Sequence, residues 1–196
     1  MSKNIKTAVV YHSGYGHNEV IAKAVERGAK KAGETALIKI SPEGKIEDGE
    51  WETLNAADAI VFGAPTYMGS ASGPFKMFAD ASSKAWFTQN WKDKVAGGFT
   101  TSHSMSGDKL NTLQQLSILA AQHGMIWASV GVPGAQQTGD AHQRNPEEMN
   151  RLGSFLGVMA QAENVAAEQS PPSGDVKTAE SYGERVANIA KKLKAA

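Results

Sequence analysis

The sequence predicts an α/β domain built on a doubly wound, five-stranded parallel sheet with helices on both faces. Two observations support this fold class: short apolar, β-branched runs recur along the chain, and amphipathic helical segments separate them. A length of 196 residues suits one domain, so we expect residues 1–196 to form it, with 133–174 as an elaborated loop region. The expected strand order is 2-1-3-4-5.

The first elements surround a glycine-rich loop. Residues 5–11 read I-K-T-A-V-V-Y, the pattern of a buried strand. From Asn18 apolar residues recur at helical spacing, and Gly33 is placed to end that helix. A second strand is expected at 36–40 and a short helix at 51–56.

The later elements continue the alternation. Residues 58–63 form a nearly continuous apolar run, typical of a strand covered on both faces. Pro74 suits a first helical turn, which predicts a helix over 74–82. The remaining expectations are a strand at 95–102, a helix at 108–122 with Leu110, Leu113 and Leu116 inward, a strand at 125–132, a helical fragment at 147–161 and a last helix from Asp175.

Composition and charge argue against several function classes. The chain has 20 Lys+Arg and 20 Asp+Glu, and this zero net charge disfavours nucleic-acid binding. It has no Cys, which excludes a disulfide scaffold, thiol catalysis and Cys-ligated metals, and no HxH or HExxH spacing suggests another metal site. Because neither a membrane span nor a signal peptide is present, we expect a cytoplasmic protein without membrane contact.

The loop between the first strand and the first helix reads Y-H-S-G-Y-G-H-N. In doubly wound folds this loop lies at the carboxyl edge of the sheet, where small residues and free helix N–H groups can hold an anion. A Walker loop would need Gly-Lys-Ser/Thr, and a dinucleotide fingerprint would need Gly where Glu19 stands. The pattern that remains suits one monophosphate group, and an ordinary tight turn explains it about equally well.

Two further loops follow strands at the same edge. After the third strand comes A-P-T-Y-M-G-S, in which Tyr67 and Met68 offer exposed apolar surface to a planar ring. After the fourth comes T-T-S-H-S-M-S-G, which has many donors and no charge and suits a polar ring edge, with a solvated loop as the alternative. Together the three loops predict a site for a phosphorylated planar heterocycle.

These motifs resemble those of the flavodoxin-like family, and more closely the tetrameric WrbA-type NAD(P)H:quinone oxidoreductases. The resemblance rests on S-G-Y-G-H-N-E, on A-I-V-F-G-A-P-T-Y-M-G, on F-x-D-x-x-x-x-x-W ending at Trp86, and on Q-H-G-M at 122–125. It implies FMN as cofactor, NADH or NADPH as electron donor, a small-molecule quinone as acceptor and a homo-oligomer (dimer or tetramer).

The resemblance also assigns residues. It places the FMN phosphate against Ser13, Tyr15, Gly16, His17 and Asn18, the isoalloxazine against Pro65, Thr66, Tyr67, Met68 and Gly69, and the polar ring edge against Thr101, Ser102, His103, Ser104, Met105 and Ser106. Tyr15 matches a residue associated with the nicotinamide, and Trp86 matches one that lines the quinone pocket, from the same or a neighbouring subunit. Trp86 and Trp91 are expected to be exposed at a subunit interface.

The chain departs from the family pattern at several of these positions. Tyr67-Met68 stands where the family has Arg-Phe, and Gln122 stands where it has a flavin-facing His. The following residue, His123, is the candidate proton or hydrogen-bond donor to the quinone, the alternative being a residue that interacts with the last carbonyls of its helix.

The expected reaction is two-electron hydride transfer from NAD(P)H to quinones through FMN, with ping-pong kinetics. Two alternatives remain: a one-electron carrier, and a flavin-binding stress or regulatory protein. A one-electron carrier is expected to be markedly acidic for steering, so the neutral charge favours the enzyme.

Overall fold

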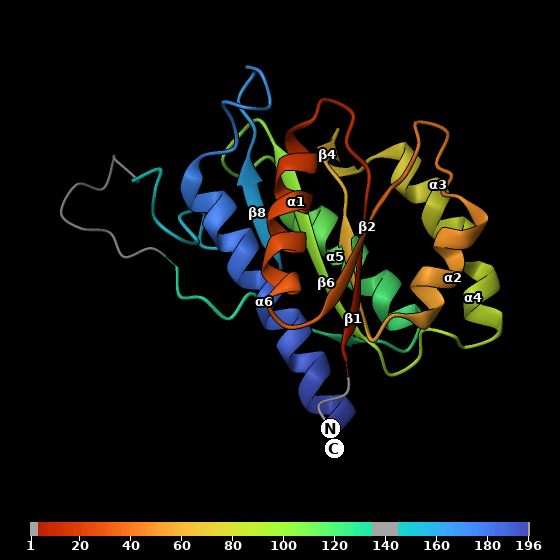
Figure 1. Cartoon of the computed structure of the whole chain (residues 1–196). Helices are drawn as coiled ribbons and strands as arrows, with labels where there is room; N and C mark the ends of the chain where they lie inside the picture. Colours follow the sequence, from red (N-terminus) through yellow and green to blue (C-terminus); the bar gives the residue numbers. More distant parts are fainter. Residues whose placement is uncertain (1–3, 135–144, 196) are drawn as a thin grey trace.

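The computed structural model describes residues 4–134 and 145–195 (Figure 1). Its main sheet is parallel, with the order β2-β1-β3-β6-β7 and with β8 also paired to β6. The strands are β1 (Lys6–Tyr11), β2 (Glu34–Lys39), β3 (Ala59–Gly63), β6 (Val95–Ser102), β7 (Ile126–Trp127) and β8 (Val158–Gln161). This order confirms the predicted doubly wound, flavodoxin-like sheet, because β1 and β3 flank the point where the winding reverses.

Six helices and a small hairpin complete the part of the chain that the structure describes. They are α1 (His17–Lys30), α2 (Asp48–Ala56), α3 (Gly73–Ala81), α4 (Ser83–Phe87), α5 (Lys109–Gln122), α6 (Ser173–Ala195), and the antiparallel pair of β4 (Thr66–Tyr67) and β5 (Ser70–Ala71). The predicted helix at 74–82 is therefore confirmed as α3, and a further short helix follows it.

The helices cover both faces of the sheet, as predicted. On one face α1 and α6 pack over β1, β3 and β6, with Val25 and Tyr182 among the buried residues. On the other face α2, α3, α4 and α5 enclose a second cluster that includes Phe62, Phe78 and Leu116. β3 is buried along its whole length, which explains its unbroken apolar sequence.

The strands that follow α5 in the chain differ from the prediction. The strand expected at 125–132 pairs with β6 only over 126–127, at the amino end of β6. The carboxyl end of β6 pairs instead with β8, in the segment expected to be helical. Gly153 and Asn150 both have positive φ, and such residues interrupt a helix, so the helical periodicity of 147–161 could not be realised.

Two side chains occupy positions opposite to those predicted. Leu110 is 52% exposed, whereas the neighbouring Lys109 is fully buried on the inner side of α5. Trp91, expected at a surface, is also fully buried and donates its indole N–H to the Asn55 side chain at 2.9 Å. The buried side chains of Lys109 and Trp91 each end in a polar N–H group, and in the folded chain each of these groups has a hydrogen-bond partner.

Candidate functional site

The three predicted loops meet around one cavity at the carboxyl ends of the strands. Its volume is about 670 Å³, and its wall is formed by Ser13, Tyr15, His17, Asn18, Pro65, Thr66, Tyr67, Met68, Thr101, Ser102, His103 and residues 162–167. The first two loops are held together by β1 and β3, where the His12 N–H donates to the Gly63 carbonyl at 2.9 Å. The cavity lies where doubly wound folds bind ligands.

The first loop leaves the start of α1 open to an anion. Gly16 is the N-cap residue, with φ +88°, and as a glycine it has no side chain to cap α1, although Ser13 Oγ accepts from the Glu19 N–H. The first N–H groups of a helix have no intrahelical partner, so those of His17 and Asn18 can bind a phosphate. A Cβ on Gly16 would lie 2.9 Å from the Ala167 Cβ, so only glycine fits at this position of the loop. These residues fit the phosphate of FMN.

The polar side chains of this loop mainly fix its shape. Ser13 Oγ accepts from the Glu19 N–H at 3.2 Å, and the Asn18 side-chain amide donates to the His12 carbonyl at 2.8 Å. His17 Nε2 lies 2.9 Å from the Val165 carbonyl, which ties the loop to the segment after β8. Backbone N–H groups therefore remain the main anion donors, and the side chains hold them in place.

The second loop is a tight hairpin turn between β4 and β5. Met68 and Gly69 are its two central residues, with φ of 47° and 80°, as a two-residue turn of this kind requires. The Asn111 side chain donates to the Gly69 carbonyl at 2.7 Å and steadies the turn. Met68 is fully exposed at the cavity wall. The strand before it is anchored by Thr66, whose hydroxyl lies 2.7 Å from those of Thr100 and Thr112.

Two tyrosines stand at the cavity mouth. Tyr15, 79% exposed, and Tyr67 form an edge-on pair with ring centroids 6.0 Å apart and an interplanar angle of 68°. Burial and the neighbouring Tyr15 raise the pKa of Tyr67, so its hydroxyl stays protonated at neutral pH. The pair offers apolar ring faces to a planar ligand, beside the protonated hydroxyl of Tyr67.

The third loop contributes only its first part to the cavity. Thr101 is buried, and Ser102 and His103 reach the wall. The remaining residues lie away from the cavity wall: Met105 is exposed, while the Ser104 and Ser106 carbonyls accept from the Lys109 side chain and backbone N–H. Ser104, Met105 and Ser106 therefore shape the loop around Lys109.

The segment after β8 is a part of the wall that the sequence did not reveal. Residues 162–167 follow β8 at the same sheet edge as the three predicted loops. Val158 and Ala160 of β8 are buried and Met159 and Gln161 are half-buried, but three of these four residues are apolar, so the sequence itself shows no clear strand alternation. A strand assignment there would have placed the following loop at the carboxyl edge.

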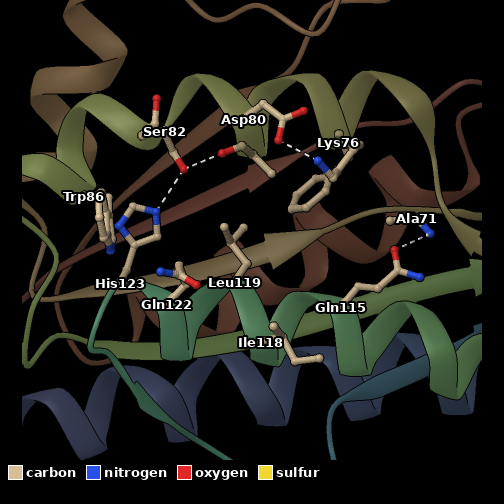
Figure 2. A pocket seen from close by; sticks show the side chains of 13 residues that line it. Ala71, Lys76, Asp80, Ser82, Trp86, Gln115, Ile118, Leu119, Gln122 and His123 are labelled. Atoms are coloured by element: carbon tan, nitrogen blue, oxygen red, sulfur yellow. Dashed lines mark hydrogen bonds and ion pairs between the residues drawn. The ribbon is translucent and has the colours of Figure 1, made fainter.

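His123, Gln122 and Trp86 lie in a second pocket, away from the three loops. α5 runs back from the cavity for 14 residues, about 20 Å, so its last turn lies near the amino end of β6. This pocket, of about 470 Å³, is a largely apolar groove between α3 and α5 (Figure 2). Within one chain the structure therefore does not bring these three residues to the cofactor loops.

His123 is tied into the protein core. Its Nε2 lies 2.9 Å from Ser82 Oγ (Figure 2). Its ring also packs on Trp91, with ring centroids 4.3 Å apart. Ser82 Oγ donates to the Ala79 carbonyl at 2.6 Å, so His123 Nε2 is the donor and Nδ1 is unprotonated. Nδ1 is buried without a partner, and burial lowers the pKa of His123. The side chain is therefore neutral at pH 7.

Acidification is expected to destabilise the protein through its buried histidines. Burial lowers the pKa of His123, and burial with the nearby Lys39 lowers the pKa of His12. The unfolded chain therefore takes up protons first, near the ordinary value of about 6.5. The histidine contribution to the free energy of unfolding should be fully present above about pH 7, fall as pH drops through 6.5 and level off below the folded-state pKa values. Urea unfolding from pH 8 to 5 measures this, and His123→Gln should make the fall smaller. Equal or greater stability at pH 5 would contradict the prediction.

Replacing Met68 is expected to raise the stability of the protein and to weaken its binding of FMN. A non-glycine residue at positive φ costs about 1 kcal/mol, and asparagine tolerates that conformation better. Since the Met68 side chain is fully exposed, Met68→Asn should raise the free energy of unfolding of the apoprotein by about 0.5–1 kcal/mol. The same change should weaken FMN binding, because it removes apolar surface from the cavity wall. Urea unfolding measures the stability, and fluorescence titration with FMN measures the affinity. A loss of stability would contradict the expected rise in the free energy of unfolding.

Among the described residues, no group of three or more His, Asp or Glu is placed to hold a metal ion. No helix in the described ranges is long and apolar enough to cross a membrane.

A doubly wound parallel sheet whose loops enclose a cavity at the switch point defines a flavodoxin-like class of α/β protein. The family model described as NADPH-dependent FMN reductase matches residues 11–138, and the chain belongs to this family. The predictions of FMN as cofactor and NAD(P)H as electron donor are confirmed at the level of the family.

Individual relatives agree with the WrbA-type resemblance. The chain is 44% identical over 190 residues to the flavodoxin FldP of Pseudomonas aeruginosa, covering 97% of this chain and 99% of the relative. It is 30% identical over 205 residues to an NAD(P)H dehydrogenase (quinone) of Archaeoglobus fulgidus, covering 94% and 97%. A crystal structure of a flavodoxin, WrbA-like protein from Agrobacterium tumefaciens is 46% identical and covers 96% of this chain and 99% of that one, with a TM-score of 0.77.

Proposed function

We propose that the chain holds FMN in the cavity at the carboxyl ends of β1, β3, β6 and β8, and that it transfers two electrons from NAD(P)H to quinones. One observation carries the proposal: three loops from separate parts of the chain enclose a cavity at the switch point of the sheet, beside the first turn of α1. Relatives named NAD(P)H dehydrogenase (quinone) support the reaction.

The residues divide the cavity into a phosphate end and a ring end. The N–H groups that follow Gly16 would bind the phosphate, helped by the positive end of the α1 dipole. Tyr67, Met68 and the Ser102 region would border the ring and exclude water from one side of it. FMN, when bound, supplies the hydride chemistry at its ring. Donor and quinone would bind in turn at the exposed side of the ring, near Tyr15.

The test is steady-state kinetics with the FMN-loaded protein. We expect oxidation of NADH or NADPH that depends on added benzoquinone, with parallel double-reciprocal plots as ping-pong turnover requires. No quinone-dependent oxidation of either donor would overturn the proposal.

A one-electron carrier is the second candidate, because the relative FldP is named a flavodoxin. An anaerobic reductive titration of the FMN-loaded protein separates the two. Two resolved one-electron steps without turnover would support the carrier, and a single two-electron step with turnover would support the reductase.

We propose further that a second copy of the chain covers the cavity mouth with its α3–α5 groove. Both surfaces expose large apolar side chains: Tyr15 and Met68 at the mouth, and Phe87 and Ile118 beside the groove, are between 66% and fully exposed. Such surfaces are typical of subunit interfaces. This arrangement would bring the partner's groove, with Trp86 and His123 of the partner subunit, close to the quinone.

The oligomer is tested by mass in solution. Sedimentation should give a dimer or tetramer for the wild-type chain and a smaller species for Ile118→Lys, which puts a charge on the groove rim. A wild-type monomer would overturn the proposed assembly.

A further inference from the structure

Lys109, the first residue of α5, is a fully buried amine directly behind the cavity wall. Its Nζ donates to Ser102 Oγ at 2.8 Å and to the Ser104 carbonyl at 2.6 Å. Ser102 itself lines the cavity. A buried lysine is costly unless its donors are used, so its position here needs a reason beyond packing.

The loop after β6 is folded around this amine. Gly107 has φ +52°, and a Cβ there would lie 2.2 Å from Ser102 Oγ, so the turn closes tightly over Lys109. Ser102 Oγ also donates to the Ser104 carbonyl at 3.1 Å, so both acceptors of Lys109 belong to one hydrogen-bonded turn. Removing the amine would therefore release the part of the loop that faces the cavity.

The charge of Lys109 is not cancelled by the oxygens it contacts, because both belong to neutral groups. Asp175 is the nearby carboxylate that raises its pKa, but both Asp175 oxygens already bind Arg151, at 2.9 and 3.1 Å. Burial outweighs this effect and lowers the pKa of Lys109 to about 8, which leaves most of the amine charged at pH 7. A positive charge thus remains behind Ser102.

The position of this charge relative to the ligand follows from the sheet. Ser102 pairs with Gln161 across β6 and β8, and the residues after both strands, His103 and Ala162, line the cavity. Within this low-dielectric wall a charge acts over several ångströms. FMN gains negative charge when it is reduced, so a fixed cation beside its polar edge stabilises the reduced form more than the oxidised one.

We propose that Lys109 is a positioning and charge-stabilising residue for the flavin, which holds Ser102 at the polar ring edge through the Ser102–Ser104 turn and raises the reduction potential of bound FMN. This inference rests on the proposed binding of FMN in the cavity.

The experiment measures the midpoint potential of bound FMN by anaerobic, dye-equilibrated titration, alongside the FMN dissociation constant from fluorescence. Lys109→Met removes the charge with similar side-chain volume, and Lys109→Gln keeps an amide donor for the Ser104 carbonyl. In both variants the ratio of the affinity for reduced FMN to that for oxidised FMN should fall about tenfold. This corresponds to a fall of about 30 mV in the two-electron potential. If Lys109→Met does not fold, the Gln variant decides.

Lys94 provides the matched control. It precedes β6 at the opposite end, its amine donates to the Leu54 carbonyl at 3.1 Å and to the Asn55 carbonyl, and burial also lowers its pKa to about 8. β6 has eight residues, about 25 Å, so Lys94→Met should leave the potential unchanged.

The outcomes separate the two proposals. Wild-type protein that does not bind FMN would overturn the proposed function. Two results would overturn the role of Lys109 alone in a protein that binds FMN. One is a change below twofold in the ratio of affinities for reduced and oxidised FMN in the Lys109 variants, and the other is an equal change of this ratio in Lys94→Met.

Discussion

Gly28→Ala is expected to lower the free energy of unfolding by about 3 kcal/mol. Gly28 lies in α1 where that helix crosses α6, and a Cβ there would lie 1.8 Å from the Glu180 carbonyl oxygen and 2.9 Å from the Glu184 nitrogen. Both atoms are backbone atoms of α6, so the helices would have to separate. Overpacking of this kind costs about 1–3 kcal/mol and more when backbone must move, which exceeds the helix-propensity gain of about 1 kcal/mol.

A glycine of α6 lies equally close to the backbone of α1. A Cβ on Gly183 of α6 would lie 2.0 Å from the Val25 carbonyl oxygen of α1. Two glycines on facing helices therefore set the close approach of α1 and α6, which together cover one face of the sheet (Figure 1). Gly28→Ala should consequently loosen the buried cluster around Val25 and Tyr182 as well as the two helices.

Gly49→Ala is the control for this prediction. Gly49 is an exposed residue of α2 with open space around its Cβ position, so alanine should add about 0.5–1 kcal/mol of stability. Urea or guanidinium unfolding of both variants and the wild type gives the values. A Gly28→Ala protein as stable as the wild type would show that the helices can shift at little cost.

Gly16→Ala is expected to weaken FMN binding about a hundredfold. The φ of +88° strains any other residue, and the new Cβ would meet the Ala167 Cβ at 2.9 Å. Either the loop or the segment after β8 must then move, which turns N–H groups at the start of α1 away from the phosphate. Charge-assisted hydrogen bonds are worth about 1.5–3 kcal/mol each, so losing one or two lowers affinity by about two orders of magnitude.

Fluorescence titration with FMN measures this loss, and circular dichroism verifies that the variant is folded. Gly73→Ala is the control, because Gly73 begins α3, outside the cavity, with open space at its Cβ position. It should bind FMN like the wild type. If Gly16→Ala bound FMN with an affinity within threefold of the wild type, the start of α1 would not be the phosphate-binding site.

Much of this molecule follows from local sequence patterns. The periodicity of residues 5–11, 58–63 and 95–102 identifies β1, β3 and β6, and their order along the chain places three loops at one edge. A strand end is where a parallel sheet presents its loops, so the loop residues that line the cavity could be found without coordinates. Pro65, Thr66 and Tyr67 are examples on the second loop.

Other features depend on partners far away in the sequence. β8 is a strand because the carboxyl half of β6 needs a neighbour after β7 ends, and nothing within residues 147–161 alone indicates that pairing. The burial of Lys109 in place of Leu110 depends on acceptors in the turn after β6, and no periodicity rule places a charged residue inside.

The sequence by itself determined the class of fold, the edge of the sheet at which the cavity lies and the family to which the chain belongs. Only the tertiary structure decided that residues 162–167 complete the cavity, that Lys109 lies behind it, and that His123 lies at the other end of α5. The physical reason is range: periodicity and turn residues act over a few neighbours, whereas burial and strand pairing are decided by residues brought together from across the chain.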